Sequence, residues 1–389
     1  MKGVASKILI GLGIALILAA ILWWAIAVNA LVKLPDDINS TTEYTGDMTF
    51  YVNPLNHQPL PEGQEMKFNM QVERTVSSIK DQYNSSTGAL SEEIVFNIEG
   101  FPAQNYKFSY VLDRKNMQNK NDSRAWAWTP QDVMERSPSY YPFLPLDTSK
   151  DQSYSVWKNE INDSVNSEFV NEEEKDGVTV YNFKGSFAGK DVAPAYVDVL
   201  SQSAAGGQGG LGLPKQVTFQ DIGPQLAAQG VDVNGLLALL NQKLSAADLQ
   251  ALQQPIPLNY LWDMDMETSI EPKTGAPVDV YKDAESLSAK TDFSQLAAVL
   301  AKYAQDPTLG PVLAKLQSQL SGAEPQKIFE YSYEQTDESV KKAVDDAKNQ
   351  SGKINVAKVY IPWALLIVGA LILIIGLLIG GGGAPQTDD

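Results

Sequence analysis

Two uncharged, apolar runs lie near the ends of the chain. The first covers residues 8–32 and the second residues 359–379, so they contain 25 and 21 residues. At about 1.5 Å per residue, each run is long enough to cross a hydrocarbon core of about 30 Å as a helix. Trp23 and Trp24 near the end of the first run, and Trp363 at the start of the second, are typical of a membrane interface. The pattern predicts one transmembrane helix at each end.

The first run also raises the alternative of a cleaved signal peptide, because small residues at 25–27 and 28–30 resemble cleavage sites. A signal peptide normally carries only about 7–15 apolar residues, so the length favours an uncleaved anchor. Lys2 and Lys7 precede this run and favour a cytoplasmic N-terminus. We therefore expect a two-pass protein of the inner (plasma) membrane. Its predicted parts are a cytoplasmic N-terminus (1–7), an exterior, periplasmic domain (33–358) and a cytoplasmic tail (380–389).

From about residue 40 to residue 200 the exterior domain has the alternation of β-strands. Residues 67–73, 93–98 and 106–112 alternate polar and apolar side chains, as strands with one buried face do. Asp176-Gly177 separates two further strand-like runs and predicts a hairpin. We expect an α+β fold with a mainly antiparallel β exterior domain, either barrel-like or sandwich-like.

The second half of the domain adds helices. A glycine-rich connector covers residues 201–216, and helical patterns follow at 232–254 and 292–321. Ser245-Ala246-Ala247-Asp248 matches a capping box. The apolar stripes either pack on the sheet or line a cavity for an apolar ligand. The leucines that would line such a cavity are Leu236, Leu240, Leu296, Leu300 and Leu313.

Residues 124–146 concentrate aromatic side chains among prolines. Proline-fixed turns hold rings at low entropic cost, which suits recognition of an apolar or sugar ligand. The alternative is a long connection whose rings close the end of a β-core. The candidate ligand-binding aromatics are Trp126, Trp128, Tyr140, Tyr141 and Phe143.

Residues 260–270 alternate strictly, which places Asp263, Asp265 and Glu267 on one face of a strand. Three carboxylates on one face have three interpretations: an exposed sheet face, a Ca²⁺ site, or the acid pair of a glycan hydrolase. No feature of the sequence separates their pKa values, so we expect neither a catalytic nor a metal site.

Composition narrows the function further. The chain has no Cys, a single His (His57) and a net charge of −17, all of it within residues 33–358. Disulfides, thiol chemistry and cysteine zinc sites are therefore excluded, and a nucleic-acid partner would be repelled. We expect a protein without enzymatic activity or cofactor.

Four short motifs resemble those of the actinobacterial "porin PorA family" of envelope proteins. The resemblance runs nearly end to end and rests on residues 40–42, 121–130, 177–183 and 353–355. Members are similar to factors of mycolic-acid bacteria that assist export of trehalose mycolates beside a resistance-nodulation-division type lipid exporter. A weaker likeness, in residues 270–275 and 352–355, is to class B scavenger receptors, which have an anchor at each end of a β-rich domain that contains a lipid tunnel.

These observations lead to two main expectations. In the first, the protein binds or relays a long-chain glycolipid such as a trehalose mycolate and works with a membrane lipid exporter. In the alternative, it is a scaffold subunit of an export complex with no ligand of its own. Gly11, Gly13, Gly369 and Gly376 would then allow close contacts between membrane helices.

Overall fold

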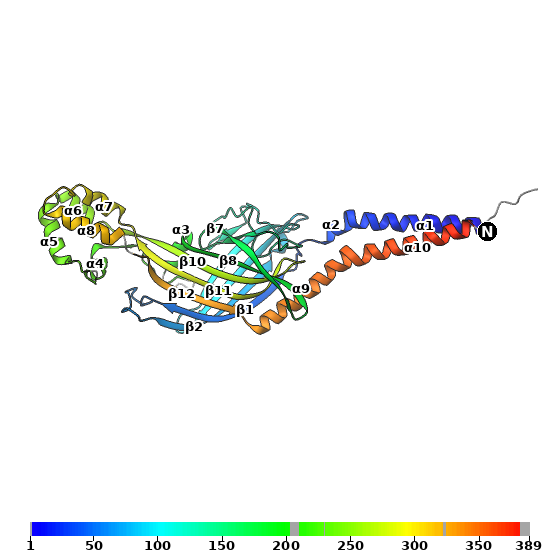
Figure 1. The fold of residues 1–389 in the computed structure, drawn as a ribbon, viewed down its shortest axis with the longest axis horizontal. Coiled ribbons are helices and arrows are strands. Elements are labelled where there is room, and N and C mark those ends of the chain that lie inside the picture. Colours follow the sequence, from blue (N-terminus) through cyan, green and yellow to red (C-terminus); the bar gives the residue numbers. More distant parts are fainter. Residues whose placement is uncertain (1, 203–209, 229, 322–323, 382–389) are drawn as a thin grey trace, which may run out of the picture.

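A computed structural model describes residues 2–202, 210–228, 230–321 and 324–381. The molecule is elongated, with a pair of long helices at one end, a curled sheet in the middle and a group of short helices at the other end (Figure 1). Part of the predicted connector (residues 203–209) and most of the predicted cytoplasmic tail (residues 382–389) lie outside the described residues.

The two anchors are continuous helices that leave the same end of the sheet. α1 (Lys2–Leu22) passes through a π-helical turn, η1 (Trp23–Ala27), into α2 (Val28–Leu31). α9 (Asp337–Asn355) passes through a second π-helical turn, η4 (Val356–Tyr360), into α10 (Ile361–Gly381). The segments Gly3–Leu31 and Asp337–Gly380 are long and apolar enough to cross a membrane. This finding agrees with the predicted two-pass arrangement around a large β domain.

Glycines allow α1 and α10 to pack at short range. A Cβ added to Gly13 would lie 2.7 Å from the backbone nitrogen of Leu373 and 2.8 Å from the carbonyl oxygen of Gly369. Ser6 Oγ donates a hydrogen bond to the carbonyl oxygen of Gly376 at 2.7 Å. Three of the four glycines expected to serve helix contacts therefore act within the protein's own helix pair, whereas Gly11 has open space beside it.

Two indole groups join the π-helical turns. Trp23 Nε1 donates to the carbonyl oxygen of Ala357, and Trp24 Nε1 donates to that of Lys358, both at 2.9 Å. The Trp24 ring also meets Trp363 edge to face at 6.1 Å. A π-helical turn is a local widening of an α-helix, and such turns occur often at functional sites. These hydrogen bonds hold the N-terminal and C-terminal helices together at the two π-helical turns.

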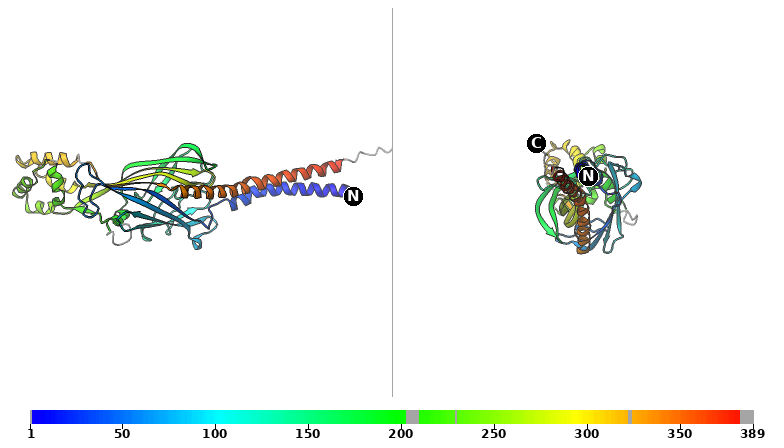
Figure 2. Two further views of the ribbon diagram at one scale, coloured as in Figure 1. Left: turned by 90° about the horizontal axis from the view of Figure 1, so that it is seen from below. Right: turned by 90° about the vertical axis from the view of Figure 1, so that its right-hand side faces the viewer.

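The middle of the molecule is one antiparallel sheet in the order β5-β4-β3-β2-β1-β12-β11-β10-β8-β7-β6, with β9 paired to β10. The sheet curls on itself, as the view along the helix pair shows (Figure 2), and buried apolar side chains fill its interior. The prediction of an α+β fold with an antiparallel sheet is confirmed. The strands are β1 (Asn39–Phe50), β2 (Met66–Ser78), β3 (Thr87–Ile98), β4 (Gln104–Asp113), β5 (Trp126–Ala127), β6 (Tyr154–Lys158), β7 (Asp163–Lys175), β8 (Val178–Asp191), β9 (Gln216–Val217), β10 (Ile256–Glu271), β11 (Ala276–Thr291) and β12 (Gln326–Gln335).

The segment between β4 and β6 connects the two edges of this curled sheet. The backbone nitrogen of Asn119 donates to Ser139 O at 2.9 Å, next to the end of β4. The backbone nitrogen of Tyr140 donates to Ser155 O at 2.8 Å, and Tyr140 O accepts from Trp157 N in β6 at 3.0 Å. The aromatic segment therefore covers the open side of the curl with its own backbone.

Local sequence signals account for several turns. Asp176 and Gly177 both have positive φ angles, 46° and 76°, as the predicted two-residue hairpin between β7 and β8 requires. Within the region expected to be all β, residues 194–200 instead form a helix, α3 (Pro194–Leu200), with Pro194 in its first turn. Proline suits that position because the first turn needs no N–H donor. A short 3₁₀ turn, η2 (Lys80–Gln82), connects β2 to β3.

The distal helices form a separate small core. They are inserted between α3 and β10 and between β11 and β12, and their leucines pack against one another. The predicted cap is present, because Ser245 Oγ accepts from Asp248 N at 3.2 Å. These helices are α4 (Phe219–Ala228), α5 (Val233–Lys243), α6 (Ala246–Leu252), α7 (Ser294–Ala301) and α8 (Leu309–Ser321).

Replacing Gly13 by Leu should separate α1 from α10, because the added side chain meets backbone atoms that cannot move aside. The chain has no Cys, so introduced cysteines report the helix contact without background. Ser6→Cys with Gly380→Cys is a suitable pair, since a Cβ on Gly380 would lie 3.4 Å from that of Ser6. We expect disulfide formation in membranes to become severalfold slower with Gly13→Leu. The control Gly11→Leu, where the space is open, should leave the rate unchanged; equal slowing by both would contradict this packing.

Candidate binding cavity

The curled sheet encloses a cavity of about 150 Å³. Side chains alternate along each strand, so one face of every strand points into the curl and supplies the lining. Most of that lining is aromatic or aliphatic. The aromatic rings in the wall come from the inner face of several strands and from the segment between β4 and β6. They include Phe96, Phe108, Trp128, Tyr141, Phe143 and Tyr331.

The cavity follows the length of the sheet. Its lining at the membrane-proximal end includes Ile270 and Pro277, which flank the turn from β10 to β11. This turn is attached to the anchor, because Lys273 Nζ donates to Asn355 Oδ1 of α9 at 3.0 Å. Further from the membrane the lining reaches Leu200 of α3 and Leu211. The cavity therefore starts at the end of the domain that the anchors hold.

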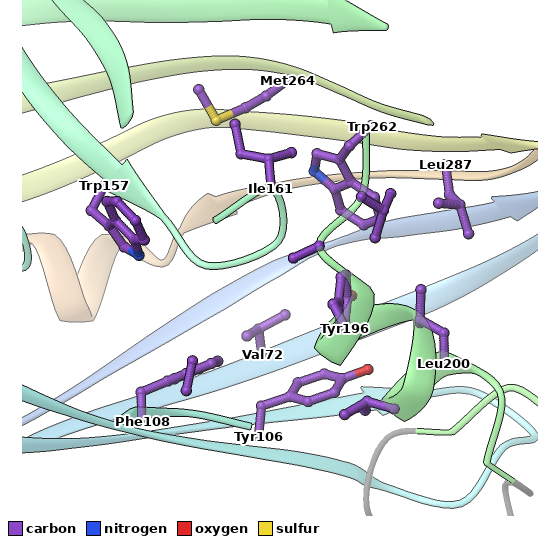
Figure 3. Close-up of a cluster of buried hydrophobic side chains, with 14 of the residues drawn as sticks. Val72, Tyr106, Phe108, Trp157, Ile161, Tyr196, Leu200, Trp262, Met264 and Leu287 are labelled. Carbon is purple, nitrogen blue, oxygen red and sulfur yellow. The ribbon is translucent and has the colours of Figure 1, made fainter. Parts of the chain in front are cut away.

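The helix α3 marks the far end of the cavity. Tyr196 stacks on Trp128 at 4.2 Å between ring centroids and meets Trp262 edge to face at 5.5 Å. Tyr196 and Leu200 project into the space between the strand carrying Trp262 and the strand carrying Tyr106 (Figure 3). Trp262 and Leu287 are fully buried in this layer.

Beyond this layer lies a distal groove of about 560 Å³ between the sheet and the distal helices. Leu258 and Tyr260 of β10 contribute to it, together with Ile222 and Leu226 of α4. Because Leu258, Tyr260, Trp262 and Met266 differ by even steps along one strand, the groove and the cavity lie on the same inner face. A smaller hollow, of about 400 Å³ against about 560 Å³ for the distal groove, borders α7.

One buried ion pair supports the cavity wall. Arg74 Nε donates to Glu92 Oε1 at 2.6 Å, and the Glu92 side chain has no exposed surface. Tyr110 and Tyr141 also donate their hydroxyls to Glu92, at 2.7 and 2.8 Å. Burial raises the pKa of both phenols, with a further contribution from the Glu92 carboxylate, so they stay protonated as donors. The network fixes Tyr141 in the wall.

A second charged group lies across the cavity, on β6 and β11. Lys158 Nζ donates to Glu285 Oε1 at 2.7 Å and lies 4.0 Å from Glu160 Oε2. Burial opposes the charge of Lys158, but Glu285 and Glu160 outweigh it and hold the pKa of the ammonium well above its usual value. Asp283 accepts from the Tyr333 hydroxyl at 2.8 Å. Burial and the neighbouring Glu285 raise the pKa of Asp283 well above its usual value.

The structure divides the predicted ligand-binding residues into two places. Trp128, Tyr140, Tyr141 and Phe143 line the cavity. Trp126 lies outside this lining and pairs with Ser109 in the short ladder of β5 and β4. The five leucines are buried together in the distal core, where Leu296 and Leu300 also border the smaller hollow; they are Leu236, Leu240, Leu296, Leu300 and Leu313. The distal groove lies between the sheet and these helices, but none of the five leucines lines it.

Sequence reasoning missed the charged residues of the cavity, above all Asp283 and Glu285. A signal was available, because positions 283, 285 and 287 share one face of a strand and Leu287 is apolar. Because Asp283 and Glu285 share a strand face with an apolar residue, the pattern indicates that their charged side chains are buried. Arg74 and Glu92, by contrast, are brought together only by the pairing of β2 with β3.

The acidic face of β10 is neutralised by lysines. Asp265 pairs with Lys184 at 2.9 Å and with Lys282 at 2.5 Å, and Glu267 pairs with Lys184 at 3.2 Å. Asp263 accepts from Ser286 Oγ at 3.0 Å. Across the described residues, no group of three or more His, Cys, Asp or Glu side chains is placed to hold a metal ion. The face is therefore a ladder of ion pairs.

The chain belongs to the Porin PorA family, whose family model matches residues 5–378. The resemblance stated from the sequence motifs is thereby confirmed at the level of the family. No curated protein matches the sequence. The anchors and the family together identify a membrane-associated envelope protein.

Replacing Glu92 by Ala should destabilise the domain by about 3–5 kcal/mol, because Arg74 is left buried without its counter-charge. The hydroxyls of Tyr110 and Tyr141 lose their acceptor at the same time. Urea unfolding of the full chain in detergent, followed by near-ultraviolet circular dichroism, measures the loss.

The matched control is Glu93→Ala, on the opposite face of the same strand. Glu93 forms an exposed pair with Lys107 at 3.4 Å, so its removal should cost no more than about 1 kcal/mol. Equal losses for the two variants would show that the Glu92 network does not support the wall.

Proposed function

We propose that this member of the Porin PorA family binds or relays a long-chain glycolipid of the trehalose mycolate type and takes its acyl chain into the curled sheet. It acts by binding, without catalysis, and works beside a resistance-nodulation-division type lipid exporter in the same membrane. The observation that carries the proposal is the aromatic and aliphatic cavity inside a sheet whose membrane-proximal turn is bonded to the anchor.

The size of the cavity suits part of an acyl chain. A dry apolar cavity of about 150 Å³ accepts a guest of about six carbons, such as benzene, so the curled sheet holds roughly six chain carbons. Burying about six methylenes would contribute about 5 kcal/mol, which corresponds to a dissociation constant of about 0.2 mM before ordering costs. A longer chain leaves its remainder outside the sheet, toward the membrane or the distal groove.

The outer face of the sheet supports a position in water rather than in lipid. Asp265, Glu267, Lys184 and Lys282 stand together on that face of β8, β10 and β11. A lysine facing lipid costs about 2–4 kcal/mol near the bilayer centre, and an acidic side chain costs less. We propose that α1 and α10 cross the inner membrane, with both termini in the cytoplasm and the sheet on the periplasmic side.

A photoreactive glycolipid tests this function directly. The full chain is reconstituted in a bilayer with a trehalose ester whose acyl chain carries a diazirine, and the labelled peptides are mapped by mass spectrometry. We expect labelling of inner-face residues of β3, β10 and β12 in addition to the anchors. Labelling confined to α1 and α10 would overturn the proposal and favour the scaffold alternative.

Filling the cavity should reduce the interior labelling. Met266→Trp places a larger side chain in the lining, whereas Glu267→Trp places the same side chain on the outer face of the same strand. We expect a severalfold loss of β3 and β12 labelling for Met266→Trp and no loss for Glu267→Trp. Labelling of α10 is the internal standard for the amount of probe in the bilayer.

A further inference from the structure

Three polar atoms in the cavity wall have no hydrogen-bond partner within the described part of the chain. They are Oδ1 of Asp283, Nε1 of Trp128 and Oγ1 of Thr268. Asp283 is only 5% exposed, and all three residues belong to the cavity lining. An unpaired buried polar atom costs about 1–3 kcal/mol, so such atoms in a lining indicate a group that joins them from outside the chain.

A chain of contacts connects the residues Trp128 and Asp283 through the interior. The Trp128 ring stacks on Tyr196, and Tyr196 meets Trp262. The Trp262 indole donates to Glu285, which follows Asp283 by two residues on the inner face of β11. Tyr196 and Trp262 face each other in the interior (Figure 3). We call Trp128, Asp283 and Glu285 the polar zone of the cavity.

Charge excludes an anionic guest from this zone. The cations of the described lining are already occupied, since Arg74 pairs with Glu92 and Lys158 pairs with Glu285. A carboxylate or phosphate would therefore meet Glu160, Asp283 and Glu285 without a free counter-charge. Desolvating such an anion would cost several kcal/mol.

Hydrogen-bond chemistry also separates a hydroxyl from an ammonium. The Trp128 Nε1–H is a donor and needs an acceptor, which an ammonium group does not offer. The Asp283 oxygen needs a donor. A hydroxyl group supplies both functions without a charge.

We propose that the polar zone binds uncharged hydroxyl groups of the guest amphiphile, which donate to Oδ1 of Asp283 and accept from Nε1 of Trp128. This inference rests on the proposed function, in which the cavity holds an apolar chain. The hydroxyl groups belong either to a sugar headgroup or to a hydroxylated chain.

The test uses the full chain in phosphatidylcholine nanodiscs and a series of diazirine alkyl probes of about six carbons, matched to the cavity. The probes differ only in the polar end: an alcohol, a glucoside, a carboxylate or a trimethylammonium group. Labelling of β11 and β12 is divided by labelling of α10, which corrects for partitioning into the bilayer. We expect the ratio for a hydroxyl probe to exceed that for the carboxylate by about fivefold or more. Preference for the alcohol assigns the hydroxyl to the chain, and preference for the glucoside assigns it to the sugar.

Variants separate the polar zone from the cavity as a whole. Asp283→Leu and Trp128→Phe should each remove the preference for hydroxyl probes while an alkyl chain still labels the interior. Asp283→Asn keeps an uncharged acceptor and should keep the preference, as should the outer-face control Asp265→Asn. Trp128→Phe retains an aromatic ring that can stack on Tyr196. If circular dichroism shows that Asp283→Leu does not fold, the hydroxyl preference of Trp128→Phe alone tests the inference.

Two results would overturn the inference while leaving the proposed function intact. One is equal interior labelling by the alcohol, glucoside and carboxylate probes in the unmodified chain. The other is a higher ratio for the trimethylammonium probe than for both hydroxyl probes. Absence of interior labelling by every probe, in contrast, would reject the proposed function itself.

Discussion

The backbone hydrogen bonds of Tyr140 are the constraint on which the rest of the exterior domain depends. A sheet that presents Phe96, Tyr331 and Trp262 on one face exposes a large apolar surface unless it curls and is covered. Curling leaves an open side between β4 and β6, and Tyr140 fills it by bonding to Ser155 and Trp157 while its neighbour Ser139 bonds to Asn119. The strand edges are thereby covered, which also removes a route to aggregation. The same segment then supplies rings to the cavity wall.

A second constraint comes from the chain ends. β1 begins and β12 ends at the same end of the sheet, and these strands are paired to each other. The two anchors must therefore run side by side, and small residues at their contact allow a close approach. The bonds from Trp23 and Trp24, together with the pair of Lys358 and Asp147, connect the membrane helices to each other and to the domain. The cavity consequently keeps a fixed relation to the membrane.

Features with a local cause could be predicted from the sequence. The alternation of β10, the hairpin at Asp176-Gly177 and the cap at Ser245 each depend on neighbouring residues, and each is present. The closure by Tyr140 depends on strands that are distant in sequence, so no local pattern reveals it. For the same reason the aromatic residues could be recognised as a group, but their position inside the curl could not. The leucines were recognised as buried, yet their partners turned out to be one another.

The charged residues of the cavity show why an apolar container carries polar groups at all. Arg74, Glu92, Lys158 and Glu285 are each held in a pair, and a buried pair contributes little net stability after its desolvation cost. Apolar residues of similar size would fill the same space without that cost. The unpaired atoms of Asp283 and Trp128 add a further cost. Under the proposed function, a guest that supplies their missing partners would recover this free energy only when it is bound. The stability given up by these polar groups would then become selectivity for the guest, which an entirely apolar interior would not provide.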